Sequence, residues 1–292
     1  MPLFSIIIPS YNRAHVIQNT IEGILKQSFT DFELLIVDDG STDNTDEIVN
    51  SYTDSRIHYK YQNNSGVCSA RNTGAQNAIG DYLIFLDSDD FIEREWLEDF
   101  YIVLKQSACD VIYCNVKMVY SNGAIKLLDA NCPYGVVKEN GVKGTDLTGS
   151  WVVKKALFFK VGMYDEHIKF GENNELRLRF HSEKITVGIV SKYNLIYNVS
   201  IDGGGKNYIN KVNSILYILN KHKDYYNQNK NSKKLFLQSA AVAAIRIGDY
   251  KKAHTLFRTA LFENKLNLKL WLQYLLSSHS YLSRLKWKSG YS

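Results

Sequence analysis

Acidic residues gather directly after two apolar runs of the chain. Asp38 and Asp39 follow one run, and the four residues from Asp87 to Asp90, with the sequence DSDD, follow another. Three carboxylates this close in sequence repel one another unless a cation lies near them. Oxygen ligands of this kind suit Mn²⁺ or Mg²⁺ held against a phosphate. We therefore expect Asp87 and Asp89 to bind a divalent cation.

Asp90 has a simpler explanation than metal binding. Glu93 follows it by three residues, as in a capping box, so Asp90 is expected to begin a helix. The sequence has no Gly-x-Gly-x-x-Gly after its first apolar run and no Gly-Lys-Ser/Thr, which disfavours a dinucleotide fold and a P-loop. Arg71 is the cation best placed to neutralise a phosphate, and a surface salt bridge is an equal alternative for it.

Apolar runs alternate with helical patterns in the first third of the chain. Three runs predict buried strands at Phe4–Ile8, Leu34–Val37 and Tyr82–Leu86, and Ile57–Tyr61 predicts a weaker strand. Helices are expected between them, within residues 16–25, 41–49, 67–78 and 96–104. This alternation indicates an α/β fold whose parallel sheet is covered on both faces. Both acid clusters would then lie at the carboxyl ends of the parallel strands, which is where ligands bind in such folds. Residues 110–151 are expected to form mixed structure on the edge of the sheet.

Charge divides the 292-residue chain into two regions. Residues 1–204 hold 19 Lys and Arg against 27 Asp and Glu, whereas residues 205–292 hold 16 against 3. The pattern also becomes helical after the glycine run at 203–205. We therefore expect one domain at 1–204 and a basic, aromatic-rich helical region at 205–292. A composition of 45% hydrophobic and 22% charged residues is that of a globular protein.

The basic region suits an anionic membrane surface, which would attract its cationic and aromatic residues together. Nucleic acid is not expected, because no recognised binding motif is present. The plain alternative is a helical domain that packs on the rest of the chain or on a second subunit, and the oligomeric state stays open. The sequence shows no secretory signal, no run long enough to span a bilayer and no Cys-x-x-Cys pair. We therefore expect a cytoplasmic protein that docks peripherally on the inner face of the cell membrane.

A series of short motifs resembles family 2 glycosyltransferases in order and spacing. They are SIIIPSYN at 5–12, VDDGSTD at 37–43, Gly66 with ARNTG at 70–74, DSDD at 87–90, GMYDE at 162–166, and GENNEL at 171–176 with Arg179. The resemblance runs from about residue 4 to residue 105 and resumes at Gly162. It implies the GT-A fold, with a mixed, mainly parallel sheet flanked by helices and followed by the helical region.

The resemblance also implies which residues bind the donor substrate. These are Pro9, Tyr11, Asp38, Asp39, Arg71, Asp87 and Ser88. Pro9, Tyr11 and Asp39 would line the nucleobase pocket, while Asp38 and Arg71 would lie near the nucleoside and the diphosphate.

The implied donor is a nucleotide sugar, most often a UDP-sugar in such enzymes. Asp87 and Asp89 would hold the ribose and the metal ion, with Asp89 as the direct ligand. The ion would stabilise the departing diphosphate. Transfer with inversion also needs a base that deprotonates the acceptor hydroxyl as it attacks. The acceptor would be a glycan or a lipid-linked acceptor in cell-surface polysaccharide synthesis.

The chain departs from the family at the position of this base. The family's Gly-Glu-Asp segment usually provides an aspartate, and this chain has Asn173 there. An amide cannot accept the proton, so we expect the adjacent Glu172 to replace it. Glu175, about one helical turn further on, is a second candidate for the base on the acceptor side, but it is less well aimed.

Three other residues are weighed for the acceptor side. Asp165 and Glu166 are more distant base candidates, with a loop cap as the plain alternative for them. Trp151 either stacks on a sugar or packs in the core. Because of Asn173, the main alternative to an active enzyme is a sugar-nucleotide-binding protein impaired in catalysis. A transferase that modifies a protein acceptor is a further alternative.

Overall fold

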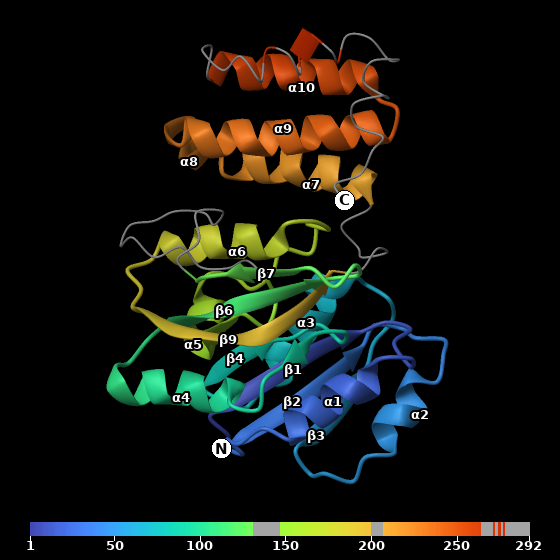
Figure 1. Cartoon of the computed structure of the whole chain (residues 1–292), viewed down its shortest axis with the longest axis vertical. Helices are drawn as coiled ribbons and strands as arrows, with labels where there is room; N and C mark the ends of the chain where they lie inside the picture. Colours follow the sequence, from blue (N-terminus) through green and yellow to red (C-terminus); the bar gives the residue numbers. More distant parts are fainter. Residues whose placement is uncertain (131–146, 200–206, 264–270, 272–273, 276, 278–292) are drawn as a thin grey trace. The chain divides into compact units, whose positions relative to one another are not determined.

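The computed structural model describes residues 1–130, 147–199, 207–263, 271, 274, 275 and 277 (Figure 1). The chain divides into two compact units. The first comprises residues 1–166 and 172–201, and the second comprises residues 167–171 and 202–292. The domain boundary expected near residue 204 falls within residues 200–206, outside the described residues.

The first unit is built on a nine-stranded mixed sheet with the order β3-β2-β1-β4-β8-β6-β9-β5, and β7 pairs with β6. The first four strands are parallel: β1 (Phe4–Ser10), β2 (Phe32–Asp38), β3 (Ile57–Tyr61) and β4 (Tyr82–Phe85). The remaining strands are β5 (Phe91–Ile92), β6 (Val111–Tyr120), β7 (Ile125–Leu128), β8 (Trp151–Lys154) and β9 (Val187–Val199). Of residues 110–151, which the sequence predicts as mixed structure on the sheet edge, β6 and β7 are strands of the sheet and residues 131–146 lie outside the described residues. The strand that joins the parallel part is β8, which pairs antiparallel with β4 through residues 152–154.

Helices cover both faces of this sheet, which confirms the expected α/β architecture (Figure 1). One face carries α1 (Ile17–Leu25), α2 (Thr45–Asn50) and α4 (Trp96–Gln106), and the other carries α3 (Val67–Asn77), α5 (Lys155–Lys160) and α6 (Glu172–His181). Alternate residues of β1 separate the two cores. Ile6 and Ile8 belong to the first and Ile7 to the second, because successive side chains of a strand point to opposite faces.

The expected capping box at Asp90 and Glu93 is wrong. The residues after Asp90 form β5, in which Phe91 pairs with Ile196 of β9, and α4 begins only at Trp96. Pairing with a distant part of the chain therefore overrides the local helix signal. Asp90 is left buried between two strands instead of at a helix end.

Residues 208–263 of the second unit are helical, as the sequence pattern predicts, and most of the pattern beyond them lies outside the described residues. The unit contains α7 (Tyr208–Lys221), α8 (Lys223–Gln228), α9 (Lys230–Arg246) and α10 (Tyr250–Glu263). Small residues such as Ala240 and Ala244 allow Phe257 and Leu261 to pack closely in its core. None of the helices among the described residues is long and apolar enough to cross a bilayer.

A short segment from the middle of the sequence belongs to this second unit. Phe170 packs against its core, and the backbone N–H of Lys169 donates a 3.0 Å hydrogen bond to Oγ of Ser214 on α7. The sequence does not predict this grouping, since residues 167–171 lie far from the helices that contact them.

Candidate active site

The register of the parallel strands places both acid clusters at one edge of the sheet, as expected. Ser10 at the end of β1 lies beside Asp38 at the end of β2, and β4 runs parallel to β1 into Asp87. Pro9 is buried within β1, whereas Tyr11 beyond the strand is half-exposed. This edge therefore gathers the residues predicted to bind a nucleotide, although their contacts with a donor stay a prediction.

The first acid cluster is buried and fully hydrogen-bonded. Asp38 accepts bonds from the backbone N–H of Ser41 at 2.7 Å and from the Tyr59 hydroxyl at 2.8 Å. Asp39 accepts bonds from the backbone N–H groups of Ser65 and Gly66, both at 2.8 Å, and from the side chain of Gln62. These bonds fix the loop that leads into α3. The two carboxylates thus hold the loops at the carboxyl ends of these strands in place.

Arg71 on α3 links the second acid cluster to α6. Its side chain is almost completely buried, with Nη2 at 2.7 Å from Oδ1 of Asp87 and Nη1 at 3.0 Å from Oε1 of Glu172. Nη2 also lies 3.2 Å from Oγ1 of Thr148. Burial alone would lower the pKa of Arg71, but the charges of Asp87 and Glu172 raise it well above its usual value. The surface salt bridge considered for Arg71 is therefore wrong, because this cation is an interior link between two acids.

The second acid cluster is crowded and incompletely bonded. Burial and the charge of Asp87 raise the pKa of Asp90 well above its usual range, and partial desolvation with the charge of Asp87 also raises the pKa of Asp89. Oδ2 of Asp90 is buried without a hydrogen-bond partner among the described residues. Ser88 is buried and holds the turn, with its carbonyl accepting a bond from Thr20.

This cluster fits a cation that is shared with a ligand. Across the described part of the chain, no group of three or more His, Cys, Asp or Glu side chains could hold a metal ion alone. The crowding of Asp87 and Asp89, with the unpaired oxygen of Asp90 in the same turn, would suit a cation at this cluster. Oxygens of a bound diphosphate would have to complete its coordination.

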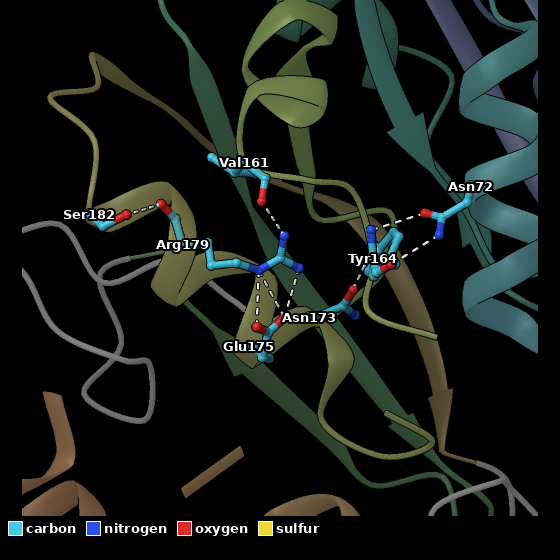
Figure 2. Close-up of polar contacts among 7 residues, drawn as sticks. All are labelled: Asn72, Val161, Tyr164, Asn173, Glu175, Arg179 and Ser182. Carbon is cyan, nitrogen blue, oxygen red and sulfur yellow. Dashed lines mark hydrogen bonds and ion pairs between the residues drawn. The ribbon is translucent and has the colours of Figure 1, made fainter. Parts of the chain in front are cut away.

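The first turn of α6 is held by a chain of hydrogen bonds (Figure 2). The buried hydroxyl of Tyr164 donates to Oδ1 of Asn173 at 2.8 Å, and Nδ2 of Asn173 donates to Oγ1 of Thr148 at 3.2 Å. Asn72 of α3 bonds both the backbone N–H and the carbonyl of Tyr164, each at 3.0 Å. Both ends of the Asn173 side-chain amide, at the position expected for the base, are therefore hydrogen-bonded to other side chains of the protein.

The other acids considered for the base role lie in different settings. Glu175 is completely buried and pairs with Arg179, whose guanidinium nitrogens lie 2.7–3.1 Å from its carboxylate (Figure 2). Glu166 is exposed and accepts a 3.0 Å bond from Asn72, and Asp165 precedes it in the same half-buried turn. Glu172 combines contact with Arg71 and partial exposure, since 18% of its side chain is accessible.

Trp151 is a core residue. It is only 4% exposed and packs between Phe85 and Phe180, with ring centroids 5.8 and 5.9 Å away. Its position in β8, inside the sheet, leaves no ring face for a sugar. The stacking role considered for Trp151 is therefore wrong.

Sequence reasoning missed three residues that organise this site, namely Asn72, Tyr164 and Thr148. Asn72 and Tyr164 lie inside recognised motifs, so a closer interpretation of ARNTG and GMYDE could have found them. Thr148 lies outside all of the motifs. Thr148 precedes β8, and its contact with Arg71 depends on the pairing of β8 with β4. No local sequence pattern predicts this contact.

Comparisons with known proteins agree with this architecture. Residues 5–160 match the model of glycosyl transferase family 2. An uncharacterized glycosyltransferase of Rickettsia felis is 31% identical over 265 residues, which cover 87% of this chain and 43% of that protein. The putative teichuronic acid biosynthesis glycosyltransferase TuaG of Bacillus subtilis is 35% identical over 147 residues, covering 49% of this chain and 58% of TuaG. The chain thus spans less than half the length of the rickettsial relative.

A solved structure supports the fold. TarS 1–349 of S. aureus in complex with UDP-GlcNAc superposes with a TM-score of 0.65 at 21% identity, covering 96% of this chain and 91% of that one. At this identity the likeness concerns the fold alone. Together with the family match, it confirms the GT-A fold that the resemblance implies.

Proposed function

Because the chain belongs to glycosyl transferase family 2, we propose that it transfers a sugar from a UDP-sugar, with inversion, to a glycan or lipid-linked acceptor. The observation that carries the proposal is the buried Arg71. It forms ion pairs both with Asp87, the proposed donor-binding acid, and with Glu172, the proposed base. The name of TuaG and the UDP-GlcNAc complex of TarS support a role in cell-surface polysaccharide synthesis and a UDP-sugar donor.

Glu172 is the proposed base. Arg71 engages Oε1, while Oε2 has no hydrogen-bond partner among the described residues and the side chain is partly exposed. Glu175 is sealed against Arg179, and Asn173 cannot take a proton. Glu172 would remove the proton of the acceptor hydroxyl while the acceptor oxygen attacks the anomeric carbon and the bond to the diphosphate breaks.

Mn²⁺ or Mg²⁺ is the proposed cofactor. Asp89 would bind the ion directly and Asp87 would support it from the same turn, where their carboxylates crowd together. The ion would neutralise charge on the departing diphosphate. Arg71 holds Asp87 in place from the protein side.

The proposal is tested by a nucleotide-release screen. Purified protein is incubated with Mn²⁺ and UDP-, GDP- or dTDP-sugars, with and without an extract of lipid-linked glycans. We expect UDP release that depends on the extract. Release that needs an added protein instead would favour a protein acceptor, and release from GDP- or dTDP-sugars alone would contradict the UDP donor.

A sugar-nucleotide-binding protein without transfer activity is the second candidate. The observation that favours it is Asn173, whose amide is bonded at both ends and cannot act as a base. Donor binding without any release by the wild-type protein, combined with transfer by Asn173→Asp, would support this candidate against the first.

We further propose that the basic second unit docks a cytoplasmic enzyme on an anionic membrane surface. Residues 205–292 carry 16 Lys and Arg against 3 acids, and each basic residue near such a surface contributes about 1 kcal/mol. Full-length protein should therefore bind vesicles that contain anionic lipid at low salt and leave them as salt rises. Failure to bind at low salt would instead favour packing or dimerisation as the role of the unit.

A further inference from the structure

The contacts around Arg71 form a closed set that includes two neighbouring residues of α6. Arg71 contacts Glu172 through Nη1 and Thr148 through Nη2, and Thr148 accepts a bond from Asn173. Glu172 and Asn173 are joined by a peptide bond, so the start of α6 is fixed at two successive side chains. A shift of either one would move the other.

Tyr164 touches this closed set at two points. Its hydroxyl donates to Asn173 at 2.8 Å, and the guanidinium of Arg71 lies 5.3 Å from the centre of its ring. Asn72 holds its backbone from α3, so Tyr164 is itself anchored. Burial raises the pKa of the hydroxyl well above its usual value despite the nearby charge of Arg71, so the group remains a donor.

The direction of these bonds gives Asn173 a specific use. Tyr164 donates to the amide oxygen, and the amide nitrogen donates to Thr148. Thr148 thereby accepts from Asn173 and from Arg71, which is the full acceptor capacity of a hydroxyl. An amide matches both neighbours at once, because it offers an acceptor on one side and a donor on the other.

We propose that Tyr164 and Thr148 are positioning residues that clamp Asn173 and thereby hold Glu172 against Arg71, which also pairs with Asp87. This inference rests on the role of Glu172 in the proposed function. Neither residue needs to touch a substrate. Small displacements of a reacting group reduce rates strongly, by up to about 100-fold for 1 Å, so the clamp affects the rate more than donor binding.

The test measures kcat, the KM for the donor and UDP affinity in Tyr164→Phe, Thr148→Val and Thr148→Ser. We expect Tyr164→Phe and Thr148→Val to lower kcat about 10-fold or more, with KM and UDP affinity within about twofold of wild type. Thr148→Ser keeps the hydroxyl and should retain most of the rate. Tyr82→Phe is the matched control, because it removes a hydroxyl that donates to the Cys109 carbonyl at 3.1 Å in the same unit. It should leave kcat unchanged.

The same substitutions in a Glu172→Gln background separate positioning from general loss of structure. If Tyr164 acts through Glu172, then Tyr164→Phe should cause little further loss of the residual rate in that background. A full additional 10-fold loss there, or a wild-type kcat for Tyr164→Phe alone, would overturn the inference while leaving the proposed function intact. Absence of transfer by the wild-type protein would instead overturn the proposed function, and this inference with it.

Discussion

The two acid clusters at the sheet edge have similar sequences but opposite surroundings. Asp38 and Asp39 are surrounded by donors, most of them backbone N–H groups of nearby loops. Asp89 and Asp90 instead crowd against Asp87, and a buried oxygen of Asp90 has no partner among the described residues. Buried carboxylates that are fully hydrogen-bonded stabilise the fold, whereas crowded carboxylates destabilise it unless a proton or a cation neutralises their charge. The comparison therefore supports a structural role for the first cluster, whereas ligand binding by the second stays a proposal.

Asp89→Ala should give the largest effect and would sharpen this comparison most. We expect transfer to be abolished and UDP to bind more weakly in Mn²⁺, with a much smaller loss in EDTA, because the carboxylate would link the ion to the protein. Calorimetric titration of UDP with and without Mn²⁺ measures this. Equal UDP affinity of variant and wild type in Mn²⁺ would remove Asp89 from the metal site.

Glu172→Gln tests the acid that Arg71 connects to the second cluster. The substitution should lower the transfer rate about 10²–10⁴-fold, the usual contribution of a general base, and leave UDP binding nearly unchanged. Melting temperature measured on the same preparation is the control, since loss of the Arg71 ion pair also affects stability. An unchanged rate would shift the search for a base to Asp165 and Glu166.

Asp39→Ala tests the architectural side. Removing the Asp39 carboxylate deprives the partly buried donors of Gly66 and Gln62 of their acceptor, so we expect the free energy of unfolding to fall by about 1–3 kcal/mol. Urea denaturation measures it. Asp54→Ala is the control, because its pair with Arg56 is partly exposed and is expected to contribute about 1 kcal/mol or less. Full stability of Asp39→Ala would break the distinction between the clusters.

Asp90→Asn should have the smallest effect, and one that depends on pH. Because burial raises the pKa of Asp90 above the value of 3.8 expected in the unfolded chain, the folded protein loses stability as the pH rises above about 4. The neutral amide avoids this loss. In EDTA, the variant should melt above wild type at pH 7 and show no advantage near pH 4. A lower melting temperature at pH 7 would contradict the crowding.

The sequence predicts those parts of the fold that depend on local patterns. The apolar runs locate β1, β2 and β4, and the acids that follow them meet at one edge because parallel strands end together. It fails where distant segments decide. The sequence around Asp90 resembles a helix cap, but the residues after it form β5, which pairs with β9. Trp151 resembles a residue that stacks on a sugar, but it belongs to β8, which pairs with β4 in the sheet. The hydroxyl of Thr148 reaches Arg71 through tertiary packing, for which the sequence contains no signal.

The segment at residues 167–171 affects how this protein can be recombined with its relatives. Its contacts belong to the second unit, with Lys169 bonded to Ser214 and Phe170 packed in the helical core, yet one peptide bond joins Gly171 to Glu172. The helical unit is therefore encoded by two separate pieces of the gene. A chimera that exchanges only the C-terminal helices would pair them with a foreign segment directly before the proposed base. A functional exchange must include both pieces.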